Sequence, residues 1–322
     1  MDANNTGARI GKWLEDNEDL PDDKFIERYR SMSRGLDTAV RNTMKAVVER
    51  VCRSVCKDDE NPGCYQIRGK GRNECFELCS SKEGMEDVVY LPIRPIIAAG
   101  EDITFVCDGR FALDLTATAL EEFERQDIPE LGRLTACAGV SMVHAHSPFI
   151  RAYGMAEQLC GNAKRFVRET HQRTGQWFSA IDWHIDPSGG VESLSEVRKG
   201  LQKPDGDHLT AKPYLFMDSC KPGSWKWFVE EILYGKNGFL SAWCSRKSKL
   251  QTLKRLVAEE RHEIRKTLSD WALTSGGLSL PESLDQSDGF VLRDGVRGRI
   301  TPIINAVELV DLFMSLDGGE TP

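Results

Sequence analysis

The stretch RPIIAAGEDITFVC at residues 94–107 places two adjacent carboxylates, Glu101 and Asp102, between two apolar runs. Residues of high β-propensity supply both runs, which is typical of buried strands. Gly100 permits a tight turn between them because glycine adopts backbone conformations that other residues disfavour. The stretch therefore predicts a β-hairpin that holds both carboxylates rigidly at its apex, and carboxylates held in this way are suited to bind a metal.

A second acidic position lies at Asp2, in the stretch DANNTG before a short amphipathic helix. If this loop meets the hairpin apex, the two acidic positions form a cage for divalent cations. Such a cage suits phosphoryl transfer, in which two cations stabilise the attacking and the leaving oxygen. The alternative is that Glu101 and Asp102 belong to an ordinary solvated turn.

The composition is that of a globular protein. The chain has 322 residues, of which 40% are hydrophobic and 29% charged, with a net charge of −8 and a pI near 5.4. This charge argues against a broad electrostatic contact with nucleic acid, while small nucleotides held through a metal remain compatible. No apolar run approaches the roughly 20 residues that span a bilayer, and the N-terminus lacks the features of a signal peptide. We expect a cytoplasmic protein that does not enter a membrane.

Ten cysteines are present, and five of them fall in a polar stretch over 52–84, namely Cys52, Cys56, Cys64, Cys75 and Cys79. Clustered cysteines in a chain of this size favour reduced thiols or a metal site over disulfides. Zn²⁺ is one interpretation. The other is a set of free thiols, because both close pairs have three intervening residues, which is helical spacing, whereas zinc knuckles more often have two. Cys107, Cys137 and Cys160 lie in apolar patterns and are expected to be small core residues.

Hydrophobic periodicity predicts alternating helices and strands in residues 1–200 and mainly helices in 201–322. The expected helices are 7–15, 25–56, 113–123 and 152–167, and the expected strands are 87–98, 103–107, 134–143 and 177–185. Residues 57–84 are polar and turn-rich. After Pro187–Gly190 the composition becomes more charged, so we place a boundary near residue 200. Helices over 245–271 and 303–316 follow, and the whole is an α+β protein.

Several of these stretches resemble a known family. The stretches DAN at 2–4, AGED at 99–102, TACAGV at 135–140 and AK at 163–164 resemble the palm domain of GGDEF-type nucleotide cyclases. More closely, residues 99–107, 138–140, 144–148 and LTAKPY at 209–214 look like the second palm of the large polymerase-like subunit of type III CRISPR complexes and its minimal relatives. The resemblance covers roughly residues 1–215.

This resemblance implies a ferredoxin-like palm over 1–200, with a cysteine-containing insertion at 52–84, followed by a smaller α-helical region over 201–322. It also implies an activity: a nucleotidyltransferase or cyclase that joins nucleoside triphosphates, ATP above all, into a cyclic nucleotide signal of antiviral defence. Two Mg²⁺ or Mn²⁺ ions would serve this reaction. The implied partners are ATP or another nucleoside triphosphate, a second copy of the chain or subunits of a defence complex, and RNA only indirectly.

The resemblance also implies roles for single residues. Asp2, Glu101 and Asp102 correspond to the catalytic metal ligands, and the Ala3 carbonyl is a further metal ligand. Contacts with the nucleotide are implied for Asn4, Asn5, Gly100 and Lys164, of which Lys164 corresponds to a lysine that helps to neutralise the triphosphate. By its sequence context alone Lys164 is an ordinary surface lysine.

The chain departs from the family pattern at three positions. Ala99 and Glu101 stand where the motif usually has glycine and aspartate. Asp2 should end a central strand, yet only Met1 precedes it, so we expect that strand to be missing. A catalytically silent palm that binds nucleotide or acts as a scaffold within a defence ribonucleoprotein is therefore the alternative function.

Other polar residues have structural explanations. His144 and His146 follow a strand and are expected to form hydrogen bonds within a loop. Asp182, His184 and Asp186 alternate as in a strand and so share one face, for which we favour a solvent-exposed or structural use over a catalytic one.

Overall fold

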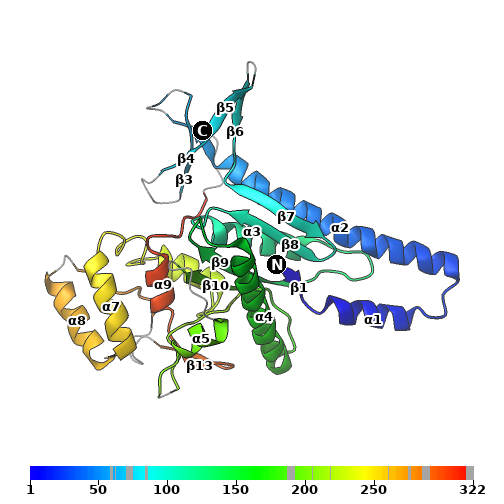
Figure 1. Ribbon diagram of the computed structural model, residues 1–322. Coiled ribbons are helices and arrows are strands. Elements are labelled where there is room, and N and C mark those ends of the chain that lie inside the picture. Colours follow the sequence, from blue (N-terminus) through cyan, green and yellow to red (C-terminus); the bar gives the residue numbers. More distant parts are fainter. Residues whose placement is uncertain are drawn as a thin grey trace. The chain divides into compact units, whose positions relative to one another are not determined.

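The hairpin expected at residues 94–107 is present in the computed structural model, which is a mixed α+β protein (Figure 1). The chain divides into two compact units, unit 1 (Met1–Ala138 and Phe313–Pro322) and unit 2 (Gly139–Leu312). The division falls inside a strand, so the compact units do not follow the boundary expected near residue 200. The structure describes residues 1–58, 61, 63–69, 75–83, 86–186, 193–204, 206–217, 219–259, 261–274, 277–284 and 291–316.

Unit 1 is built on antiparallel strands in the order β9-β1-β8-β7 (Figure 1). These are β1 (Asp2–Ala3), β7 (Ile93–Ala99), β8 (Asp102–Cys107) and the first residues of β9 (Ala136–Val143). β1 is short but central, because it pairs with β8 on one side and β9 on the other. Met1 extends this pairing: its ammonium group donates to the Ile103 carbonyl at 2.8 Å, and its own carbonyl accepts from the Ile103 amide at 3.1 Å. Met1–Ala3 thus lie at the central position of the sheet where the sequence led us to expect a missing strand.

Two helices cover one face of this sheet. α2 (Asp22–Arg53) and α3 (Ala112–Arg125) pack together, and α2 also packs against β7 and β8 (Figure 1). The apolar residues of α2 recur with helical period, and Val40, Val47 and Val51 are fully buried. Ile103 of β8 is buried as well. Because side chains alternate along a strand, Asp102 lies on the opposite face from Ile103.

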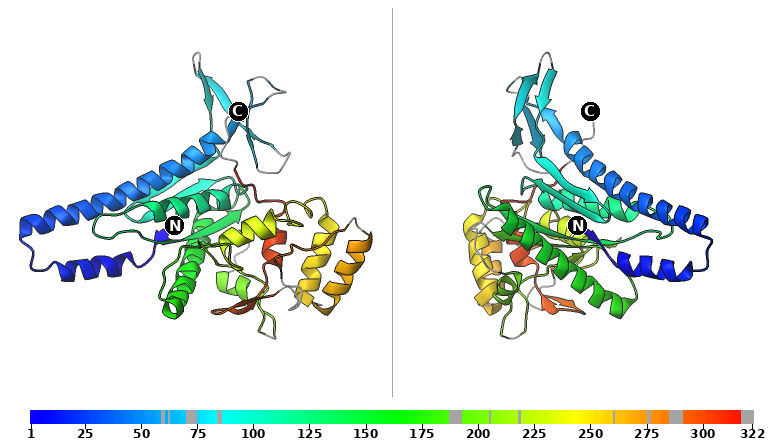
Figure 2. Two further views of the ribbon diagram at one scale, coloured as in Figure 1. Left: turned by 180° about the vertical axis from the view of Figure 1, so that it is seen from behind. Right: turned by 45° about the vertical axis from the view of Figure 1, so that its right-hand side comes forward.

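α1 (Thr6–Asp16) follows β1 directly and forms a helical hairpin with α2 (Figure 2). The ring of Trp13 lies 5.4 Å from that of Phe25 and 6.1 Å from that of Tyr29, measured between centroids. Offset and tilted aromatic pairs at such distances are favourable. They attach the helix that begins beside Asp2 to the long helix of unit 1.

The described residues of 55–89 form five short strands, although residues 57–84 were expected to be polar and turn-rich. They are β2 (Val55–Lys57), β3 (Tyr65–Arg68), β4 (Cys75–Leu78), β5 (Ser80–Glu83) and β6 (Glu86–Val89), arranged as a three-stranded sheet β2-β3-β4 and a ribbon β5-β6. Ile67 and Leu78 are buried in a cluster with Phe111 and Met314. The ring of Phe76 contacts Phe111 edge to face at 5.3 Å. Apolar packing against the core therefore holds β3 and β4 in place.

A partly buried ion pair holds the last described residues within unit 1. Asp114 of α3 accepts two hydrogen bonds from the Arg50 guanidinium, at 2.6 and 2.9 Å, and one from the Ser315 hydroxyl at 2.8 Å. Arg50 also donates to the Leu316 carbonyl at 2.9 Å. Since Asp114 is 7% exposed, its charge depends on these partners.

Unit 2 contains the rest of β9 with β10 (Ala180–Asp186) and β11 (Tyr214–Leu215), in the order β11-β10-β9. α4 (Phe149–Thr174) packs against β10, and Gly139 of β9 lies directly beneath it. A Cβ atom built on Gly139 would lie 2.1 Å from the Ala156 carbonyl oxygen and 2.4 Å from the Cys160 amide nitrogen. The absence of a side chain at Gly139 thus permits the close approach of helix and strand.

The remaining elements of unit 2 are mainly short. They are α5 (Leu194–Lys199), α6 (Trp225–Trp227), a π-helical turn η1 (Phe228–Leu233), α7 (Lys247–Glu259), α8 (Arg261–Thr274), β12 (Leu292–Asp294), β13 (Gly298–Ile300) and α9 (Ile303–Leu309). The single helix expected over 245–271 is two helices, α7 and α8, which pack side by side (Figure 1). The last helix ends at Leu309 rather than residue 316.

Candidate functional site

Asp2 and Asp102 lie directly opposite each other on neighbouring strands of unit 1. Directly opposed residues of an antiparallel pair point to the same face of the sheet, with their Cβ atoms about 4.5–5.5 Å apart. Asp102 is exposed and Asp2 half-buried, so this face of the sheet is accessible at both carboxylates. Two of the three expected carboxylates are therefore brought together by the fold, although 100 positions separate them in the sequence.

The third carboxylate, Glu101, belongs to the hairpin turn that joins β7 and β8. Gly100 precedes it with a φ of +63°, a conformation that favours glycine, and Ala99 pairs with Asp102 across the hairpin. Glu101 is half-buried. In the part of the chain that the structure describes, no group of three or more His, Cys, Asp or Glu side chains is arranged to hold a metal ion. The arrangement at this site is thus a facing pair of aspartates with Glu101 adjacent in sequence.

The residues after Asp2 turn the chain from β1 into α1. Ala3 is buried and pairs with Ala136, and Asn5 is exposed with a left-handed backbone, at φ 60° and ψ 20°. Its side chain makes no capping hydrogen bond to α1. The first turn of α1 carries the exposed Gly7, where a Cβ atom would meet no other atom within 4 Å. The amide groups of a helix N-terminus attract anions in general.

Asn4, expected to contact the nucleotide, is instead buried at 5% exposure. Its amide nitrogen Nδ2 donates to the Thr135 hydroxyl at 3.0 Å, and its oxygen Oδ1 accepts from the Cys137 thiol at 3.2 Å. Its backbone amide donates to the Thr135 carbonyl at 2.8 Å. The sequence reasoning did not identify Thr135 or Cys137 as part of the site, because their partners lie more than 130 positions away and no local pattern links them.

Further along, α1 is attached to the loop between α3 and β9. Arg9 donates to the carbonyls of Leu131 and Arg133, at 2.9 and 3.0 Å. Trp13 donates its indole proton to Glu130 at 2.9 Å, and Arg28 of α2 forms an ion pair with the same carboxylate. The hydrogen bonds from Arg28 and then Trp13 lower the pKa of Glu130. The helix that starts beside Asp2 is therefore held at several points along its length.

Lys164, the expected phosphate-binding lysine, lies in α4 of unit 2 and is half-buried. The other expected site residues, Asp2 to Asn5 and Gly100 to Asp102, all belong to unit 1. His144 and His146 lie in the turn after β9, as expected, with their ring centroids 5.6 Å apart.

Asp182 has a structural role, one of the uses favoured from the sequence. It is completely buried on β10, accepts a hydrogen bond from Asn162 of α4 at 2.7 Å, and forms an ion pair with Arg198. His184, two positions along the strand, is half-buried. Burial, and then the charges of Lys212 and Arg198, lower the pKa of His184, so the neutral imidazole is favoured.

The stretch LTAKPY, which supported the family resemblance, also packs inside unit 2. The Lys212 ammonium lies 2.6 Å from the Glu308 carboxylate and 4.7 Å from the centroid of the Trp183 ring. Trp183 donates its indole proton to the same carboxylate at 2.7 Å. Burial lowers the pKa of Lys212, while Glu308 opposes the shift. These contacts join β10, the LTAKPY segment and α9, which indicates a structural role for the motif.

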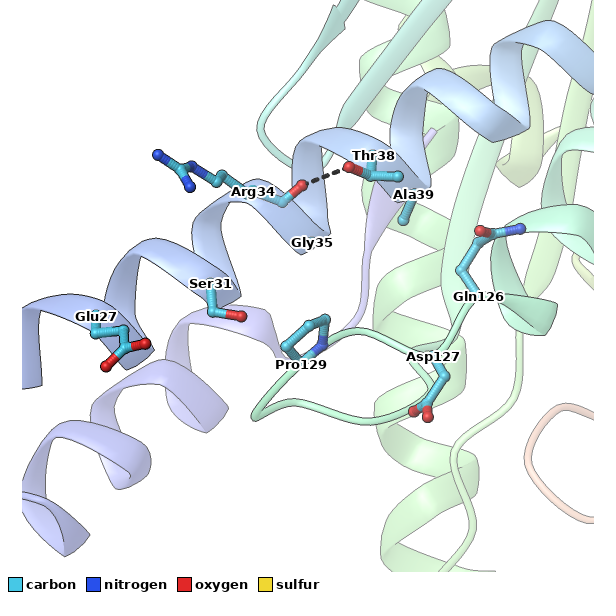
Figure 3. Close-up of a pocket in the computed structure, with 9 residues that line it drawn as sticks. All are labelled: Glu27, Ser31, Arg34, Gly35, Thr38, Ala39, Gln126, Asp127 and Pro129. Atoms are coloured by element: carbon cyan, nitrogen blue, oxygen red, sulfur yellow. Dashed lines mark hydrogen bonds between the residues drawn. The ribbon is translucent and has the colours of Figure 1, made fainter. Parts of the chain in front are cut away.

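A groove lies between α2 and the loop after α3 (Figure 3). It is lined in part by Glu27, Arg34 and Asp127, and the Arg34 side chain points away from Asp127 in Figure 3. At its floor α2 approaches the loop closely, since a Cβ atom on Gly35 would lie 2.4 Å from the Pro129 ring. The charged groups do not converge on one point, so this groove is not the candidate site.

The five cysteines considered for Zn²⁺ occupy different elements of unit 1. Cys52 lies in α2, Cys56 in β2 and Cys75 in β4, where the Cys75 side chain is outside the described part; Cys64 and Cys79 are exposed. Of the cysteines expected in the core, Cys137 is fully buried, whereas Cys107 and Cys160 are partly buried. Burial raises the pKa of the Cys107 thiol to about 12, so it stays protonated.

No protein-family model matches the chain, and no curated protein matches its sequence. Among the described residues, every helix is too short or too polar to cross a lipid bilayer.

Proposed function

We propose that this protein is a metal-dependent nucleotidyltransferase or nucleotide cyclase, with Asp2 and Asp102 as its metal-binding aspartates. The observation that carries the proposal is the register between β1 and β8, in which the two aspartates face each other on central strands. Like charges directly opposite each other destabilise a sheet. A bound cation offsets that cost, so the arrangement is readily explained by metal binding.

The connectivity of unit 1 supports the palm that the sequence resemblance implies. β1 leads through α1 and α2 to β7, the β7–β8 hairpin follows, and α3 leads to β9. Numbered along this path as strands one to four, the sheet order β9-β1-β8-β7 is 4-1-3-2 with all pairs antiparallel. This order agrees with the β-α-β-β-α-β arrangement of ferredoxin-like folds, which supports the proposed palm. In it, the end of the first strand and the central hairpin lie side by side, where Asp2 and Glu101–Asp102 are found.

The donor set fits Mg²⁺ or Mn²⁺ better than a soft metal. Mg²⁺ prefers oxygen ligands and is commonly bound by one or two carboxylates together with water and substrate phosphates. Asp2 and Asp102 supply two such carboxylates, and Glu101 or the Ala3 carbonyl would add a further oxygen. Two bound cations would lower the pKa of an attacking 3′-hydroxyl and stabilise the departing pyrophosphate. Zn²⁺ at the cysteines of 52–79 is a separate expectation.

The N-terminal turn of α1 would bind the phosphates of a nucleoside triphosphate, and ATP is the expected substrate. Asn5 and Gly7 are both exposed and would leave the first turn of the helix accessible. Gly100 at the apex is a further nucleotide-binding candidate of unit 1, and a phosphate-binding role of Lys164 is implied by the family resemblance alone. A cyclic nucleotide signal of antiviral defence, made in the cytoplasm by a homodimer or within a defence complex, is the role that the family resemblance supports.

The test is direct metal binding combined with product formation. We expect the full chain to bind Mn²⁺, as measured by electron paramagnetic resonance, and to convert ATP to a phosphodiester product seen by chromatography and mass spectrometry. Asp102→Asn should lower both the Mn²⁺ affinity and the rate of product formation by roughly 10–100-fold or more. Substitution of residues that only support a metal ligand already has an effect of this size. Asp127→Asn is the matched control, because Asp127 is an exposed loop aspartate of the same unit.

The two functions separate in this experiment. Mn²⁺ or nucleotide binding without product from any of the four ribonucleoside triphosphates, with and without candidate partner subunits, would favour the silent palm. Equal Mn²⁺ affinity of the wild type, Asp102→Asn and Asp127→Asn would refute the proposed metal site.

A further inference from the structure

We propose that Asn4 is a positioning residue, which fixes Asp2 and the start of α1 through a buried junction with Thr135 and Cys137, rather than a residue that contacts the nucleotide. The inference rests on the proposed function of the Asp2 site and assigns it a second layer of residues. The evidence for it is that both the amide nitrogen and the amide oxygen of Asn4 form hydrogen bonds within the protein.

The backbone changes direction at Asn4. β1 ends at Ala3, Asn5 has a left-handed backbone, and α1 begins at Thr6. The orientation of Asp2 relative to the first turn of α1 therefore depends on how Asn4 is held. A carboxylate and a phosphate-binding helix end must keep a fixed separation to act on one substrate, because small displacements of reacting groups are costly in rate.

The junction binds Asn4 to the strand that already pairs with Asp2. Cys137 is the register partner of Asp2 on β9, and its thiol donates to Asn4 Oδ1 at 3.2 Å. Thr135 accepts twice from Asn4, through its carbonyl at 2.8 Å and its hydroxyl at 3.0 Å. Because Asn4 is 5% exposed, its amide oxygen and nitrogen are directed into the protein. Loss of a partner would leave a buried polar group unsatisfied.

The chain offers a matched pair of substitutions. Thr135→Val removes the hydroxyl that accepts from Asn4 and keeps the shape of the side chain. Thr43→Val makes the same change at a fully buried threonine of α2 whose hydroxyl has no hydrogen-bond partner among the residues that the structure describes. Thr135→Ser retains the hydroxyl and is the conservative rescue.

Three readouts distinguish positioning from nucleotide contact. We expect Asn4→Ala and Thr135→Val to weaken Mn²⁺ binding and lower kcat by about 10-fold or more, as outer partners of metal sites do. The KM for ATP should remain within about twofold, since the contact removed is not made to substrate. The double variant should be no worse than Asn4→Ala alone, because both changes break one network. Thr135→Ser should restore wild-type values, and Thr43→Val should keep them.

The opposite result is equally clear. A raised KM in Asn4→Ala together with unchanged Thr135→Val would assign Asn4 to nucleotide binding and overturn the proposal.

Hydrogen exchange of residues 1–10 provides a readout that does not depend on activity or metal. Faster exchange in Thr135→Val than in Thr43→Val would support the junction even if the wild type binds no Mn²⁺ and makes no product, in which case only the proposed function fails. Equal exchange in both variants would refute the junction while leaving the metal site intact. Thr135→Val is the milder change, so it keeps the test valid should Asn4→Ala not fold.

Discussion

The facing aspartates make an unusual stability prediction: Asp102→Asn should stabilise the metal-free protein. If the carboxylates are taken to be as far apart as the Cβ atoms of directly opposed residues, about 5 Å, Coulomb's law gives a repulsion of about 0.8 kcal/mol at the dielectric constant of water, which is appropriate because Asp102 is exposed. Asparagine keeps the size of the side chain and removes this repulsion. In EDTA the free energy of unfolding of Asp102→Asn should therefore exceed that of the wild type by up to about 1 kcal/mol.

Added metal should reverse the order of stability, so that the wild type becomes more stable than Asp102→Asn. A ligand that binds only the folded protein adds about 2.7 kcal/mol at a concentration 100 times its dissociation constant. The wild type should gain this increment on addition of Mg²⁺ or Mn²⁺. Asp102→Asn should gain much less, because one of the two aspartate ligands is missing. At a metal concentration about 100 times the dissociation constant, the wild type should be more stable than Asp102→Asn by roughly 1–2 kcal/mol.

Urea unfolding followed by circular dichroism, with and without metal, measures both effects. Asp127→Asn should behave as the wild type does in EDTA and in metal. The reasoning would be refuted if Asp102→Asn were less stable than the wild type in EDTA, or if metal stabilised both proteins equally. The first result would mean that Asp2 and Asp102 do not repel, and the second that they do not share a cation.

Three further predictions concern packing and pH. Gly139→Ala should cost at least about 1–3 kcal/mol in urea unfolding because the new methyl group meets α4 backbone atoms, whereas Gly154→Ala, in open space within α4, should stabilise by about 0.5–1 kcal/mol. Asp114→Ala should cost about 1–3 kcal/mol in the same assay, because it leaves the partly buried Arg50 guanidinium and the Ser315 hydroxyl without their acceptor; an unchanged free energy of unfolding would contradict this. The pKa of Glu130 is lowered in the folded protein, so its carboxylate stabilises the fold. This contribution to the free energy of unfolding is complete above the ordinary pKa of 4.5 and is lost as pH falls through the lowered value. The NMR signal of the indole proton bound to Glu130 should shift in that range, and Glu130→Gln should abolish the pH dependence.

The sequence predicted the features that depend on neighbouring residues. The hairpin at 94–107 follows from its apolar runs and Gly100, and the expected strand over 134–143 and helices over 25–56 and 113–123 correspond to β9, α2 and α3. β6 overlaps the strand expected over 87–98. The strands β2 to β5 were missed because each is only three or four residues long, too short to show a period. Their stability comes from packing against the core through residues such as Ile67 and Leu78, which no local pattern reveals.

The candidate site also has features that local sequence predicts and features that only the tertiary structure shows. The sequence by itself determined that acidic residues stand at a hairpin apex and before a helix, because turn and helix signals are local. Only the tertiary structure decided that Asp2 occupies a central strand opposite Asp102, and that Asn4 is buried against Thr135 and Cys137. Strand pairing joins residues 100 or more positions apart through backbone hydrogen bonds, which any sequence can make, so the register is chosen by the packing of the whole unit rather than by the residues that end up facing each other.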